Sequence, residues 1–94
     1  MDSYNSTFGA IGQSSSANGD VCDAIISGTF VGTVALEVQD ATGNWVEVDS
    51  WTAPAKSLNN EAAFARKWRL NCTAYTSGTV DYELSAGRSR DLKR

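Results

Sequence analysis

Two runs of alternating residues, joined by a short turn, constrain this chain more than any other feature. In residues 34–39 every second residue is Val or Leu, and in residues 45–49 Val alternates with Glu and Asp. A period of two places one set of side chains on a buried face and the other toward water. The segment between them, Asp-Ala-Thr-Gly-Asn over 40–44, has turn chemistry, with Gly43 or Asn44 available for a positive φ. The pattern predicts a β-hairpin with Val46 and Val48 facing inward.

Further strands are predicted on both sides of this hairpin. Residues 21–30, 68–76 and 80–85 alternate in the same way, and residues 76–79 have the composition of a tight hairpin turn. We expect residues 60–67 to form at most one helical turn before a strand, with Asn60 as N-cap. No long helix separates the strands, so we predict an all-β fold. It is a small antiparallel β-sandwich, or partly open barrel, of about five to seven strands over residues 21–87.

The first twenty residues have no sustained period and are rich in Ser, Asn and Gly. Tyr4, Phe8 and Ile11 interrupt this polar composition. Residues 1–20 are therefore expected to be a flexible arm, which is either a disordered leader or a segment that orders only against a neighbouring subunit.

The last seven residues hold half of the eight basic residues of the chain, Arg88 and Arg90 among them. Residues 88–94 are expected to be either a solvated tail or an arm that docks on an acidic partner surface.

Bulk properties exclude several kinds of partner. The net charge of −3 implies no general attraction to nucleic acid or to anionic lipid. No apolar run has the length that spans a bilayer, and no secretory signal is visible, so we expect synthesis in a cytosol. The thiols of Cys22 and Cys72 are then expected to be reduced and to act as small buried hydrophobic groups on inward faces.

Catalytic chemistry is poorly represented. The chain has no histidine, which removes the commonest general base and the usual zinc ligand, and two isolated cysteines do not complete a zinc site. Glu47 with Asp49, and Asp81 with Glu83, each share a strand face, which is typical of a solvated surface. We therefore predict no catalytic residue, no cofactor and no metal, and a protein that is not an enzyme.

Two tryptophans fall on the polar face of the predicted hairpin. Trp45 and Trp51 share the parity of the acidic residues, which leaves three alternatives. Either a bulge shifts the register, or the rings cover the ends of the hairpin, or the rings form a contact patch. A sugar platform that uses Trp45, Trp51 or Trp68 is a further alternative. The basic cluster at residues 66–69 is too small to predict nucleic-acid binding.

The order of short motifs from Ile26 to Ser85 resembles a known module. The motifs are Ser-Gly-Thr-Phe at 27–30, Asp-x-x-Gly-Asn-Trp-Val at 40–46, Val-x-Ser-Trp-Thr at 48–52, and Trp-Arg-Leu-Asn-Cys-Thr-Ala-Tyr-Thr-Ser-Gly-Thr at 68–79. Together they are similar to a small β-sandwich of virion structural proteins in tailed bacteriophages, of the head decoration or cement type. The resemblance covers about two-thirds of the chain and transfers no catalytic residue.

This resemblance implies a non-enzymatic protein on the capsid exterior, made in the host cytoplasm. It would bind the major capsid protein and copies of itself and so stabilise the head. We expect the contacts to come from Tyr4, Phe8, Ile11, Trp45, Trp51, Arg88 and Arg90. The alternatives are a head–tail adaptor, tail or fibre component, and, in another class, a carbohydrate-binding module that contacts cell-surface polysaccharide.

Overall fold

The predicted fold class is confirmed. The computed structural model describes residues 2–88, and all regular structure in this range is β-strand. The strands are β1 (Asp2–Phe8), β2 (Gly12–Gln13), β3 (Ala17–Ser27), β4 (Phe30–Gln39), β5 (Trp45–Trp51), β6 (Ala55–Gly78) and β7 (Val80–Gly87).

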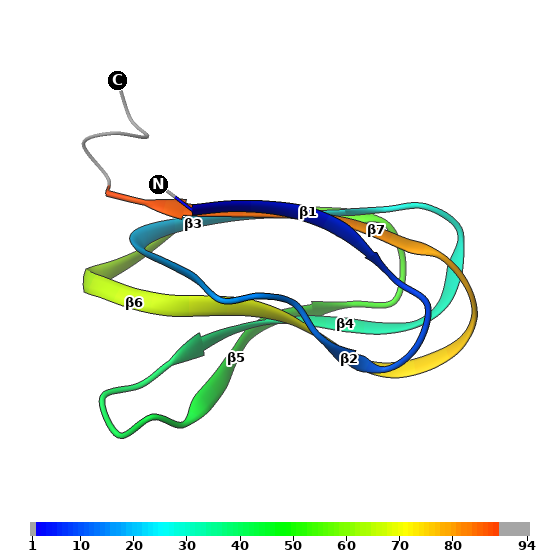
Figure 1. The fold of residues 1–94 in the computed structure, drawn as a ribbon, viewed down its shortest axis with the longest axis horizontal. Coiled ribbons are helices and arrows are strands. Elements are labelled where there is room, and N and C mark those ends of the chain that lie inside the picture. Colours follow the sequence, from blue (N-terminus) through cyan, green and yellow to red (C-terminus); the bar gives the residue numbers. More distant parts are fainter. Residues whose placement is uncertain (1, 89–94) are drawn as a thin grey trace.

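All strands belong to one antiparallel sheet that is not closed. The order is β1-β7-β3-β6-β4-β5, and β2 pairs with β6 beside this path. Figure 1 shows the sheet folded over itself, with β1, β3 and β7 in one layer and β2, β4 and β5 in the other. The strand β6 takes part in both layers, because its first part pairs with β3 and its last part pairs with β4.

The fold turns from one layer to the other at a corner made by β3 and β6. The ladder between them runs from Ala17 opposite Trp68 to Gly19 opposite Arg66, and then resumes at Val21 opposite Glu61. One residue of β3 therefore faces residues 62–65 of β6, an irregularity of the kind that lets strands change sheets. A side chain on Gly19 would collide with the backbone of Gly87, so the corner requires glycine at this position.

The core lies between the two layers and is made mostly by the predicted inward residues, with Phe8 and Ala17 added from the segment that was expected to be a flexible arm. The alternating sets of β3, β4, β6 and β7 are buried as the period of two requires. The indole of Trp68 is buried among them, and its Nε1 donates a hydrogen bond of 2.9 Å to the carbonyl oxygen of Gly19. The cluster consists of Phe8, Ala17, Cys22, Ala24, Ile26, Val34, Leu36, Trp68, Leu70, Cys72, Val80, Leu84 and Ala86.

The predicted central hairpin is confirmed, but its second strand is not oriented as expected. β4 and β5 pair, and Gly43 in the turn has a φ of 93°. Leu36 lies opposite Asp49 while Glu37 lies opposite Glu47, so Val48 is an extra residue in a bulge. The expectation that Val46 and Val48 are buried is wrong, because β5 is an edge strand and leaves both exposed.

The expected helical turn over 60–67 is wrong. Residues 60 and 61 pair with β3, and residues 62–65 form the corner. The side-chain amide of Asn60 donates to the carbonyl oxygens of Cys22 and Ser57, so it holds the ladder and does not cap a helix.

The hairpin expected at residues 76–79 is also wrong. Gly78 has the positive φ of a turn, 92°, but β7 leaves β6 and pairs with β1 and β3 in the other layer. A bulge at Thr73, between Thr33 and Val34 of β4, also turns Tyr75 toward the core and leaves Ala74 exposed.

The first twenty residues are not a flexible arm in this structure. β1 pairs with β7 along its whole length, from Asp2 opposite Ala86 to Phe8 opposite Val80. The ring of Phe8 is buried and stacks on Tyr82 with the centroids 4.6 Å apart. Phe8 is therefore a core residue that holds the N-terminal segment in the sheet. At the other end of the chain, Arg88 is exposed, while the rest of the expected tail, Arg90 included, lies outside the described residues.

Candidate interaction surfaces

A row of hydrogen-bonded side chains crosses the outer face of the layer that contains β4. The Nε of Arg69 donates to Glu37 at 2.7 Å, and the amide of Asn71 donates to both oxygens of the same carboxylate. Gln13 donates to Asn71 at 3.3 Å, and the guanidinium of Arg69 lies 4.2 Å from the ring centroid of Trp45. The row therefore spans β2, β6, β4 and β5, three strand spacings or about 14 Å.

A hollow of about 440 Å³ adjoins this row at its β2 end. Gln13 and Asn71 belong to both the row and the hollow, and Ile11, 67% exposed, forms part of the wall. The Arg69–Glu37 pair neutralises itself, so the surface offers hydrogen bonds with little net charge.

The three tryptophans differ in what they can contact. The register shift that was one of the alternatives for Trp45 and Trp51 is confirmed, and it turns Trp51 toward the core, against which it packs. Trp68 is buried and cannot form a sugar platform. Trp45 is half-buried beneath Arg69, so of the three rings it is the one that belongs to an outer surface.

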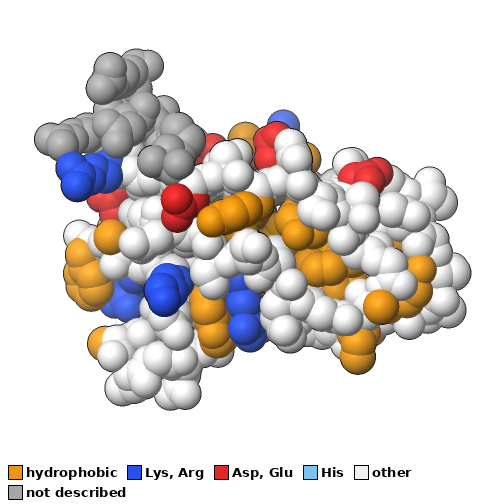
Figure 2. Space-filling model, viewed as in Figure 1, with side chains coloured by type: hydrophobic (Ala, Val, Ile, Leu, Met, Phe, Trp, Pro, Cys, Tyr) orange, Lys and Arg blue, Asp and Glu red, His pale blue; other side chains and the backbone are white. Residues whose placement is uncertain are grey.

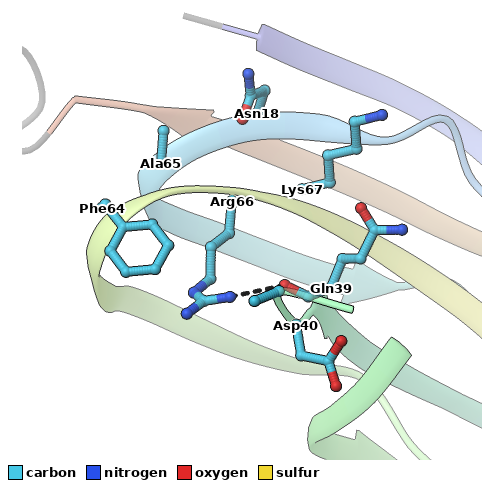
Figure 3. Close-up of a pocket in the computed structure, with 8 residues that line it drawn as sticks. Asn18, Gln39, Asp40, Phe64, Ala65, Arg66 and Lys67 are labelled. Carbon is cyan, nitrogen blue, oxygen red and sulfur yellow. Dashed lines mark hydrogen bonds between the residues drawn. The ribbon is translucent and has the colours of Figure 1, made fainter. Parts of the chain in front are cut away.

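A second hollow, of about 260 Å³, lies at the corner of the fold (Figure 3). Phe64 and Arg66 point from β6 toward Gln39 and Asp40 at the end of β4, while Lys67 points to the other side of β6. The guanidinium of Arg66 lies 4.3 Å from the ring centroid of Phe64 and donates to the carbonyl oxygen of Gln39 at 3.1 Å. Phe64 is 57% exposed in spite of this contact.

The carboxylate of Asp40, at the edge of this hollow, stabilises the turn formed by residues 40–44. Its Oδ1 accepts hydrogen bonds from the backbone N–H and hydroxyl of Thr42 and from the N–H of Asn44. The hydroxyl of Thr42, and then the N–H of Asn44, lower the pKa of the Asp40 carboxyl. These hydrogen bonds favour the ionised form of Asp40 and give its carboxylate a structural role in the turn.

The two cysteines are free and buried, as predicted. Burial, with a smaller contribution from the charge of Asp23, raises the pKa of the Cys22 thiol to about 12. Burial also raises the pKa of Cys72. Since the thiolate is the reactive form, neither residue is set up as a nucleophile.

The acidic residues do not form a site. The bulge at Val48 places Glu47 beside Glu37 on the outer face and Asp49 on the side of Leu36, so the expectation that Glu47 and Asp49 share a face is wrong. Within residues 2–88 no group of three or more His, Cys, Asp or Glu side chains could hold a metal ion. The same part of the chain contains no helix long and apolar enough to cross a membrane.

The residues predicted from the sequence to make contacts are not brought together in one patch. Tyr4 lies on β1 at one end of the sheet, and Trp45 and Trp51 lie on β5 at the other end. Ile11 is exposed beside β2. Sequence reasoning missed Phe64, whose only signal was its place in a segment that was interpreted as a helical turn, and the Glu37–Arg69 pair, which depends on strand register.

Five of the eight large exposed apolar side chains among the described residues lie along three rims of the molecule, whereas Ile25 on the interior strand β3, Val31 on β4 and Ile11 beside β2 lie elsewhere. Tyr4 is on β1, Val46 and Val48 are on β5, and Leu58 and Phe64 are on the first half of β6. Among the described residues these three segments each have a strand partner on one side only. Figure 2 likewise shows hydrophobic side chains in several separate groups on the visible face.

Comparison with known proteins gives little beyond the fold. No family model matches the chain, and no curated protein matches it at a significant level. Among solved structures the fold is similar to the Yersinia pseudotuberculosis-derived mitogen, with a TM-score of 0.51 and 13% sequence identity over 90% of this chain and 84% of that chain. At this level of identity the likeness concerns the fold alone.

Proposed function

We propose that the chain is a non-enzymatic structural subunit of a bacteriophage virion, and specifically a decoration or cement protein on the capsid exterior. The proposal rests on the motif resemblance over residues 26–85 and on one observation, that exposed apolar side chains occur on several sides of the molecule, with five of the eight along three separate rims. An enzyme concentrates its chemistry in one concave site. A subunit that is surrounded by neighbours needs contacts on several sides, and weak contacts suffice when many copies act together.

The partners in this proposal are the major capsid protein and further copies of the chain. Binding that requires the folded form would also add to the stability of this small domain. A head–tail adaptor, a tail protein or a fibre component would use the same kind of rim contacts, and these roles differ from decoration in copy number.

A second candidate, carbohydrate binding, is favoured by the row from Gln13 to Trp45. A hydrogen-bonding surface about 14 Å long, with an aromatic ring at one end and the charge of Glu47 beside it, has the chemistry to bind an uncharged glycan. Trp45→Ala should then weaken binding of a neutral oligosaccharide on a glycan array, whereas Phe64→Ala, which removes an exposed ring elsewhere, should not. Equal binding by both variants would remove this candidate.

The experiment that tests the first proposal is the copy number and radial position of the protein in purified particles, by cryo-electron microscopy and quantitative mass spectrometry. Hundreds of copies on the outer shell are expected. About a dozen copies at one vertex would assign the chain to the connector or tail, and its absence from particles would refute a virion role.

A further inference from the structure

We propose that β1 is the self-association edge of this protein, and that two copies pair through antiparallel addition of β1 to β1. The inference deepens the proposed function, because it assigns a surface to contacts between copies. It rests on a comparison of the three rims, which differ in how well they are protected against strand addition.

Two of the rims carry features that oppose regular pairing. β5 has a bulge at Val48 and two acidic residues, Glu47 and Asp49. The first half of β6 has a second irregularity at residues 58–59, where Asn59 has a φ of 58°, before the corner at 62–65. Bulges and charged side chains are the usual means by which proteins protect sheet edges.

β1 has no bulge, and its one charged residue, Asp2, is at its first position. Its register with β7 is unbroken over seven residues. From Ser3 to Phe8 it contains no charged residue and no proline, and Asp2 accepts a hydrogen bond of 2.8 Å from the N–H of Asn18 within the same copy. The hydroxyls of Ser3 and Ser85 lie 3.1 Å apart, and Phe8 is buried, so the strand is held at both ends. Its free side is therefore a straight, ordered row of backbone donors and acceptors.

A second copy of the same strand fits this edge without repulsion. The antiparallel register that uses all seven residues places Asn5 opposite Asn5 at a two-fold axis and Tyr4 opposite Ser6. Residues at even positions face the core in both copies, because Tyr4 lies opposite Leu84 and Phe8 opposite Val80. The two inner faces therefore continue into each other, and the contact is isologous. Tyr4, 36% exposed in the single copy, loses solvent contact at the junction.

The nearest like charges across this junction are well separated. Asp2 of one copy lies opposite Phe8 of the other, so it is two strand spacings and one residue, about 10 Å, from Asp81 on β7 of that copy, and the two side chains are on opposite faces of the sheet. The Glu83 residues of the two copies are three strand spacings, about 14 Å, apart. Both separations exceed the Debye length of about 8 Å at physiological ionic strength. A single seven-residue strand, about 24 Å long, gives a smaller contact than a standard interface. Association is therefore weak for two copies alone and gains from neighbours in an assembly.

The test is the mass of the full-length protein by sedimentation equilibrium from about 10 µM to about 1 mM, the range in which small interfaces associate. The wild-type protein should show a monomer–dimer equilibrium. Asn5→Glu places two carboxylates opposite each other and should weaken the dimer at least about tenfold. Ser50→Glu adds the same charge to the β5 edge and should have no effect.

A crosslink tests the register. Asn5→Cys should form a disulfide-linked dimer on mild oxidation, because the two-fold axis places this residue opposite itself. Thr7→Cys, which lies opposite Ser3 in the dimer, should not. The native thiols are buried and do not compete.

Three results would each overturn the proposal. They are a wild-type protein that stays monomeric over the whole concentration range, equal effects of the two Glu variants, and equal crosslinking of the two Cys variants. A monomer whose Asn5→Glu variant loses binding to particles would assign the edge to a strand of another protein, and would also overturn it. The sedimentation and crosslinking measurements need no particles. Failure of self-association is therefore distinguishable from absence of the protein in virions.

Discussion

Replacing the buried Trp68 by Phe tests whether the corner of the fold depends on a side-chain hydrogen bond. The indole Nε1 donates to the carbonyl oxygen of Gly19, and both residues are buried. Trp68→Phe keeps an aromatic ring but leaves this carbonyl without its donor, which costs about 1–3 kcal/mol. The smaller ring adds about 1 kcal/mol of lost packing, as expected for a modest large-to-small change. We expect the free energy of unfolding to fall by about 2–4 kcal/mol, a large part of the stability of a small domain.

The matched control is Trp45→Phe, since Trp45 is half-buried and its main contact is the guanidinium of Arg69. Phe keeps an aromatic ring that the guanidinium can contact, so the change costs at most about 0.5–1 kcal/mol. Urea denaturation followed by circular dichroism measures both variants without using tryptophan emission. A domain of this size loses about 4–8 °C in Tm per kcal/mol, so Trp68→Phe should melt roughly 8–32 °C lower. Equal losses for the two variants would refute the role assigned to the hydrogen bond.

Three further predictions concern ionisable groups. Burial raises the pKa of the Cys22 thiol from the ordinary value of 9.0 to about 12. The thiol therefore stays protonated in the folded state at pH values where it ionises in the unfolded chain. Wild-type stability should therefore decrease relative to Cys22→Ala as the pH rises above about 9, by at most about 1.4 kcal/mol per pH unit, in denaturation series at several pH values. The lowered pKa of Asp40 stabilises the fold above the unfolded pKa near 3.9, and this contribution is lost as the pH falls through the folded value. The wild-type advantage over Asp40→Asn in thermal melts should therefore vanish between about pH 5 and about pH 2, and a constant difference would contradict it. A double-mutant cycle of Glu37→Gln with Arg69→Met should give a coupling of about 1 kcal/mol that decreases with salt, and no coupling would show that the pair is only a surface contact.

The sequence predicts which faces are buried better than it predicts where strands pair. Alternation placed Cys22, Val34, Leu70 and Leu84 in the core correctly, because burial of one face is a local property of a strand. The pairing of β7 with β1 and β3 depends on residues distant in the sequence, so a turn at Gly78 was taken for a hairpin. The turn at Gly78 was predicted correctly, but the residues of the turn do not determine which strand β7 pairs with.

Bulges explain most of the other differences. One extra residue at Val48 reverses the faces of all later residues in β5, so Asp49 and Trp51 both move from the outer face to the side of Leu36 and Val34. The strand β1 was missed because five polar residues surround Tyr4 in a segment of low hydrophobicity. Tyr4 and Phe8 nevertheless share one face, and this four-residue spacing was the available indication of a strand. The outer-face row and the hollow beside Phe64 could not be predicted, because both require the register of β6 with its neighbours.

The passage of β6 through both layers has a consequence for how the protein unfolds. Neither layer can separate from the other without breaking a strand ladder that continues around the corner at Gly19. Backbone amides in the two layers should therefore exchange with solvent through the same global opening and show similar protection. Because most strand pairs join segments that are distant in the sequence, the chain should also fold slowly, on the millisecond-to-second scale of all-β domains. Slow folding in a single cooperative step would leave newly made chains with exposed edges for longer than a helical protein of this size.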